Sequence, residues 1–69
     1  MPSMIKMYGK LKSFVESSEN KSRLAAAIGI DETLLSRLLS GERSASADVI
    51  EKFYLHTAIA LSDSWTIEE

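Results

Sequence analysis

Hydrophobic residues recur along this chain at steps of three and four, the spacing that gathers side chains on one face of an α-helix. Over residues 4–17 a single apolar stripe, interrupted by lysines, predicts a first amphipathic helix. Gly9 lies inside this helix at a cost of about 1 kcal/mol in helix propensity. The apolar positions of the stripe are Ile5, Tyr8, Leu11, Phe14 and Val15.

Three further helices are predicted by the same spacing and by residues suited to begin and end them. A second helix covers residues 21–28, capped by Asn20 or Ser22 and ended by Gly29. A third begins after Asp31 and ends at Gly41, and a fourth runs from a cap at Ser46 to about Leu61. The stripe expected to close the core from the fourth helix is Val49, Ile50, Phe53, Tyr54 and Leu61.

No stretch alternates with the two-residue period of a half-buried strand, so an all-α fold is predicted. We expect a compact four-helix domain, with or without a fifth, short turn at the C-terminus. The 69 residues suit a single domain over residues 1–69. A two-helix unit occupies about residues 20–41, and an aperiodic tail covers residues 62–69, where Trp65 is the one expected anchor.

Composition narrows the class of protein. The chain has no cysteine and one histidine, so we expect neither a disulfide nor a metal site, and no cofactor. It contains no histidine–nucleophile pair, no paired carboxylates suited to a pocket and no glycine-rich phosphate loop, so an enzyme is not expected. No apolar run reaches the ~20 residues of a membrane span, and no signal peptide is visible, so a cytoplasmic protein without membrane contact is expected.

Charge is unevenly distributed along the chain, although its sum is only −2. Residues 1–43 hold seven of the eight cations and five acids, whereas residues 44–69 hold one cation and five acids. A basic first half and an acidic second half suit a protein with one face on phosphate and the other turned away. An unevenly charged, solvated surface explains the same distribution without a partner.

The segment joining the second and third helices places small, flexible and apolar residues where two crossing helices need them. Ala25 permits close contact between the helices, Gly29 permits the turn, and Ile30 fills the elbow. Leu35 and Leu38 then attach the third helix to the core and leave its opposite face free.

This segment resembles the helix-turn-helix of the lambda-repressor and Cro family. In that family Leu-Ala, three residues, Gly and an apolar residue precede a recognition helix that ends in Gly. The match is close over residues 20–43 and extends to residues 4–61 in the number and order of helices. The resemblance implies a lambda-repressor-like DNA-binding domain, a bacterial or phage transcriptional regulator that binds double-stranded DNA as a homodimer. Its recognition helix, about residues 31–40, would lie in the major groove.

The resemblance also implies roles for single residues. Arg37 is the strongest candidate, because a guanidinium can pair bidentately with guanine. The residues implied to read bases are Glu32, Thr33, Ser36 and Arg37. The residues implied to contact the DNA backbone are Asn20, Lys21, Arg43 and Ser44.

Four positions depart from the family pattern and keep a second function open. Glu32 and Glu42 are acidic near phosphate, while Leu34 and Leu39 are apolar where polar residues are common. Glu32, Leu34 and the acidic second half favour a protein-binding module on the same fold, such as an antirepressor, an antitoxin or an assembly subunit. The basic residues Arg37, Arg43 and Lys21 favour DNA.

A candidate dimer interface lies in the fourth helix and the tail. Leu55 and Ile59 are four residues apart on a charged helical face, and Trp65 can join them. We therefore expect these three residues to form a homodimer contact. The other interpretation is that the tail folds back and covers them within one subunit.

Overall fold

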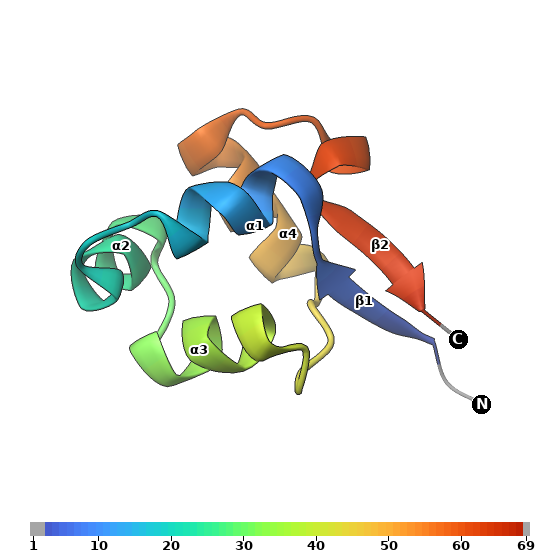
Figure 1. The fold of residues 1–69 in the computed structure, drawn as a ribbon, viewed down its shortest axis with the longest axis horizontal. Helices are drawn as coiled ribbons and strands as arrows, with labels where there is room; N and C mark the ends of the chain where they lie inside the picture. The colour runs from blue at the N-terminus through green and yellow to red at the C-terminus, as the bar shows by residue number, and fades with distance from the viewer. Residues whose placement is uncertain (1–2, 69) are drawn as a thin grey trace.

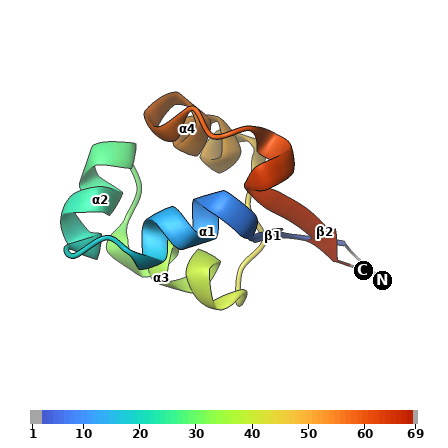
Figure 2. The same cartoon turned by 45° about the horizontal axis from the view of Figure 1, so that its top comes forward.

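The computed structural model describes residues 3–68, which form a mostly helical domain with a small sheet made from the two ends of the chain. The helices build the body, and the sheet projects from one end of it (Figures 1 and 2). The elements in order are β1 (Met4–Met7), α1 (Gly9–Glu16), α2 (Lys21–Ile28), α3 (Glu32–Ser40), α4 (Ala47–Thr57), the 3₁₀ turn η1 (Leu61–Asp63) and β2 (Trp65–Glu68). The expectation of four helices is confirmed, and the expectation of an all-α fold is wrong.

The second and third helices are confirmed, together with the signals that bound them. Asn20 caps α2, because its Oδ1 accepts a hydrogen bond from the Arg23 N–H at 3.0 Å. Gly29 ends α2 with a φ of +98° in the left-handed region. Asp31 holds the N-cap position of α3, although its side chain makes no capping hydrogen bond, and α3 ends at Gly41.

The first helix is shorter than predicted, because residues 4–7 form strand β1. This strand pairs antiparallel with β2, in a register that sets Met4 opposite Glu68 and Met7 opposite Trp65. A window of four residues does not separate a helical period from a strand period. The hydrogen-bonding partner of β1 lies at the other end of the chain, so pairing rather than local pattern decides this segment.

Helix α4 also ends earlier than predicted, at Thr57 instead of Leu61. The Thr57 hydroxyl donates to the Phe53 carbonyl at 2.9 Å and accepts from the Ile59 N–H at 3.3 Å. A side chain that bonds the backbone in this way competes with the next helical turn. Ala58 then takes a φ of +56°, and the chain leaves the helix.

The early end of α4 changes which of its residues close the core. Val49 and Phe53 are buried and Ile50 is half-buried, as the predicted stripe requires. Tyr54 and Leu61 are about half exposed, so these two assignments to the core are wrong. Leu61 lies in η1, which is the short C-terminal turn that the sequence left open.

The core lies between the four helices and also includes the sheet. Its largest fully buried side chains are Phe53, Leu11, Leu35, Leu38 and Val15. Trp65 of β2 meets Phe53 edge to face, with ring centroids 5.4 Å apart and planes at 79°. The tail therefore joins the packed domain through the buried Ser64 and the half-buried Trp65, while Ile67 and Glu68 are exposed. No helix within residues 3–68 is long and apolar enough to cross a bilayer.

Candidate nucleic-acid interface

Helix α3 has one face in the core and the other in solvent. Leu35 and Leu38 are buried, at 0% and 1% exposure, and attach the helix to the body. On the opposite side, four exposed residues line an open hollow of about 400 Å³ together with Glu42. The four are Glu32, Thr33, Ser36 and Arg37, the base-reading set implied by the sequence. The fold thus brings all four predicted residues to one surface.

The turn between α2 and α3 sets the direction in which this surface faces. The N–H groups of Gly29 and Ile30 both donate to the Ala25 carbonyl, at 2.9 Å and 3.0 Å. Ala25 is buried, and the half-buried Ile30 packs against the core, as the sequence pattern predicts. Two backbone hydrogen bonds and the packed Ile30 side chain fix this turn, and the turn fixes the start of α3.

The charges around the hollow have both signs. Arg37 lines the hollow together with two acidic residues, Glu32 and Glu42, yet no carboxylate within residues 3–68 lies within 4.0 Å of its guanidinium. Its five N–H donors are therefore available to a ligand. The two carboxylates offer hydrogen-bond acceptors to the same ligand. They repel a ligand that presents only phosphate groups to the hollow.

The residues predicted to contact the DNA backbone lie on several segments of the chain, unlike the base-reading set, which lies on α3 alone. Arg43 is exposed in the loop after α3. Lys21 donates its ammonium to the Ser18 and Glu16 carbonyls, at 3.0 Å and 3.5 Å, so it bonds the end of α1. Asn20 uses its oxygen for the α2 cap, described above, which leaves its amide N–H groups free to donate.

Ser44 is tied to strand β1. Its Oγ accepts from the Ile5 N–H at 2.9 Å, and the neighbouring Ala45 N–H donates to the Ile5 carbonyl at 3.0 Å. The loop from α3 to α4 is therefore held against the sheet. The hydroxyl hydrogen of Ser44 remains available to an acceptor such as a phosphate oxygen.

The structure adds Lys6 to the neighbourhood of this interface. The Cδ, Cε and Nζ atoms of Lys6 each lie 3.8 Å from where a Cβ on Gly41 would be, at the end of α3. The ammonium is bridged to Glu68 at 3.1 Å. No sequence signal links Lys6 to α3, because the contact depends on the position of β1 beside that helix.

Of the three residues predicted for a dimer contact, one is exposed and two pack against the core. Leu55 is exposed by 75% on α4. Ile59 lies beyond the end of α4 and packs half-buried against the core, and Trp65 packs on Phe53. The shared helical face assumed for Leu55 and Ile59 is therefore wrong, and the alternative in which the tail covers Ile59 and Trp65 agrees with these contacts.

Within residues 3–68, no group of three His, Cys, Asp or Glu side chains is arranged to hold a metal ion. In comparisons with known proteins, no family model, curated protein or solved structure matches this chain.

Proposed function

We propose that the protein binds double-stranded DNA sequence-specifically, with α3 as the recognition helix in the major groove, and that it acts in the cytoplasm as a small transcriptional regulator. The observation that carries the proposal is the two-sided character of α3. Buried leucines seat the helix, and its free face presents Glu32, Thr33, Ser36 and Arg37 on one surface. A helix with one face seated on the body of the domain and the opposite face exposed is the form in which side chains reach base edges.

The chemistry of this face supports discrimination among bases. An unpaired Arg37 suits the O6 and N7 acceptors of guanine, and a carboxylate such as Glu32 suits the N4 donor of cytosine. Arg43 and the Ser44 hydroxyl, at the end of α3, suit contacts to the DNA backbone that set the position of the helix. The repressor-like and Cro-like roles implied by the sequence resemblance would use these same residues.

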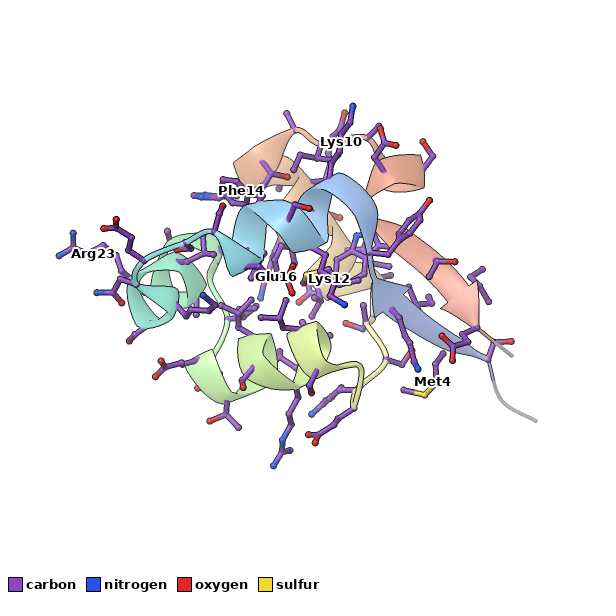
Figure 3. All side chains as sticks on the ribbon, viewed as in Figure 1. Met4, Lys10, Lys12, Phe14, Glu16 and Arg23 are labelled. Atoms are coloured by element: carbon purple, nitrogen blue, oxygen red, sulfur yellow. The ribbon has the colours of Figure 1, made fainter. Side chains whose placement is uncertain are left out.

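The test is a fluorescence titration against genomic fragments, including the DNA beside the protein's own gene, at two salt concentrations. We expect one fragment to bind more tightly than the rest. Arg37→Ala should weaken that complex by about 1–3 kcal/mol and relax preference at one base pair. Arg23→Ala is the matched control, because Arg23 is also exposed and projects from α2 at the end of the molecule away from the sheet (Figure 3). Equal losses in both variants would argue against base reading by α3.

One observation favours a second function, a protein-binding module on the same fold. Glu32 and Glu42 both line the hollow, and the chain carries a net charge of −2. An acidic rim repels DNA phosphates and suits a basic protein surface. The same titration separates the two functions: absence of binding to any fragment at low salt would favour the protein partner, as in an antirepressor, an antitoxin or an assembly subunit.

A further inference from the structure

Strand β1 passes beside the end of α3 and places a lysine there. The loop that leaves α3 lies along this strand, because Ser44 and Ala45 of the loop bond to Ile5 (Figure 1). The next residue of the strand, Lys6, has its Cδ, Cε and Nζ atoms beside Gly41, each 3.8 Å from where a Cβ would be. The Lys6 ammonium therefore lies where α3 passes into the loop that is proposed to contact the DNA backbone.

An ammonium in this place suits a DNA phosphate. Arg43 is exposed in the same loop, and the Ser44 hydroxyl keeps its hydrogen for an acceptor. The Lys6 side chain is exposed by only 28%, so its stem is already packed and only the ammonium has to turn toward a ligand. Lysine binds phosphate as a compact charge with three donors, without the fixed geometry that arginine requires. Lys6 therefore has the chemistry and the place of a further phosphate contact beside Arg43.

The Lys6 ammonium is already bound to a carboxylate of the same chain. Glu68 of β2 accepts from it, with 3.1 Å between Nζ and Oε1. The register of the sheet explains this contact, because Thr66 lies opposite Lys6 and Glu68 lies two residues further along β2. Lys6 and Glu68 are thus diagonal neighbours on one face of the sheet, a separation that long side chains can span. The carboxylate competes with any phosphate for the ammonium.

We propose that Glu68 limits the affinity of the protein for DNA, because it holds Lys6 in an ion pair and so prevents a phosphate contact at the end of α3. This inference rests on the proposed binding of DNA through α3. The carboxylate acts in two ways: it neutralises the ammonium, and it adds a negative charge beside the DNA backbone. The group that Lys6 would bind belongs to the sugar–phosphate chain, so Glu68 lowers the affinity for every base sequence alike.

The surroundings of the ion pair allow Lys6 to be released without harm to the fold. The Glu68 side chain is exposed by 61%, and exposed ion pairs contribute little to stability. Within residues 3–68 no second carboxylate lies within 4.0 Å of the Lys6 ammonium. The C-terminal end of α3 carries a partial negative charge, which keeps a released ammonium beside Gly41. Once Glu68 is uncharged, a DNA phosphate is the anion that Lys6 can bind.

Titration of a random-sequence DNA duplex at several salt concentrations tests the inference, because a phosphate contact needs no particular base sequence. Glu68→Gln removes the charge of the carboxylate and keeps the length of the side chain. One phosphate contact contributes a slope of about −0.9 in a plot of log K against log salt, so this slope should become steeper by about 1. Binding should become about eightfold tighter at about 0.1 M salt, and the gain should vanish toward about 1 M.

Asp63→Asn is the matched control. It removes the same unit of negative charge and frees another lysine, Lys10, from a carboxylate at 3.8 Å. Lys10 projects from α1 on the side of the molecule away from α3 (Figure 3). Salt screens a charge at such a place from DNA bound to α3, so Asp63→Asn should change the affinity by less than about twofold. The double variant Lys6→Gln with Glu68→Gln should bind no more tightly than the wild type, because the released cation is absent.

Equal gains in Glu68→Gln and Asp63→Asn, or a gain that persists in the double variant, would overturn the inference and leave the DNA-binding proposal standing. A gain confined to Glu68→Gln, in a protein that prefers no genomic fragment, would support the inference and argue against sequence-specific binding. Absence of binding to any duplex by every variant would overturn both. Circular dichroism checks that each variant is folded; if the double variant is not, the comparison of the two single variants decides alone.

Discussion

Positive φ angles occur at a few residues of this domain, and the surroundings differ from one to the next. A Cβ on Gly9 (φ +60°) would lie 2.7 Å from the carbonyl oxygen of Asp63, whereas a Cβ on Gly29 (φ +98°) would have the Lys52 Cδ as its nearest neighbour, at 4.0 Å. Ala58 holds a φ of +56° although it carries a Cβ. An added Cβ would therefore clash with the main chain at Gly9 and would bring torsional strain alone at Gly29. At Ala58 the torsional strain is already present.

Gly9→Ala should destabilise the domain more than Gly29→Ala. Both variants force a Cβ into the left-handed region, at about 1–2 kcal/mol. Gly9→Ala also overpacks the Cβ against the main chain of η1, which should lower the free energy of unfolding by a further amount of about 1–3 kcal/mol. Urea unfolding followed by circular dichroism measures both free energies. Equal losses would mean that Gly9 does not approach Asp63 as described.

Ala58→Gly should stabilise the domain. Relief of left-handed strain contributes about 1–2 kcal/mol, and the greater freedom of glycine in the unfolded chain removes about 0.4–1 kcal/mol of that. Ala60→Gly is the control, because Ala60 has a φ of −54° and no such strain to relieve. That variant should lower the midpoint of thermal unfolding while Ala58→Gly raises it; a lower midpoint in both would refute the strained torsion.

Among the elements, β2 connects the two ends of the chain with the core. It pairs with β1, extends the core through the contact between Trp65 and Phe53, and leaves one edge open. The nearby 3₁₀ turn positions it: the Ser64 hydroxyl, on a buried residue, donates to the Ala60 carbonyl at 2.8 Å, and Tyr8 donates its hydroxyl to the Ser62 carbonyl. A segment with no helical period is thus integral to the domain.

Trp65→Ala should therefore lower the free energy of unfolding by about 2–4 kcal/mol, because it removes a large ring from the edge of the core. Leu55→Ala, at a side chain exposed by 75%, should change it by less than about 0.5 kcal/mol. Urea unfolding at one low protein concentration compares the two. A stable Trp65→Ala variant that had merely lost self-association would return Trp65 to a partner surface.

For the whole molecule, the distribution of its cations limits how it can bind a polyanion. Three lysines are already paired with carboxylates, Lys6 with Glu68, Lys10 with Asp63 and Lys52 with Asp48. Lys21 bonds carbonyl oxygens at the end of α1. The cations that remain without such a partner within residues 3–68 are Lys12, Arg23, Arg37 and Arg43.

DNA affinity should therefore depend only moderately on salt. Each phosphate contact contributes a slope of about −0.9 in a plot of log K against log salt, so four cations give a slope no steeper than about −4 per subunit. Arg43→Ala should make the slope shallower by about 1 and weaken all sequences alike. Titrations at several salt concentrations measure both slopes. A wild-type slope near −6 or steeper per subunit would show that the paired lysines also bind phosphate.

The parts of the fold that local sequence specifies were predicted well. Asn20, Gly29 and Ser46 act at the helix ends where the sequence places them, because a cap or a turn depends on neighbours within a few residues. The burial of Leu35 and Leu38 could be predicted, because the helical period alone places them on one face of α3. For the same reason the exposed face of α3 could be predicted residue by residue, whereas its function remains a proposal.

Contacts between distant segments settled the rest. Residues 4–7 become a strand because β2, at the other end of the chain, supplies a hydrogen-bonding partner. Ser44 and Lys6 acquire partners on segments far away in sequence. Pairing, burial and charge neutralisation at these places depend on which surfaces meet after folding. The periodic pattern of hydrophobic residues does not specify which surfaces meet, because it indicates only which side of an element is apolar.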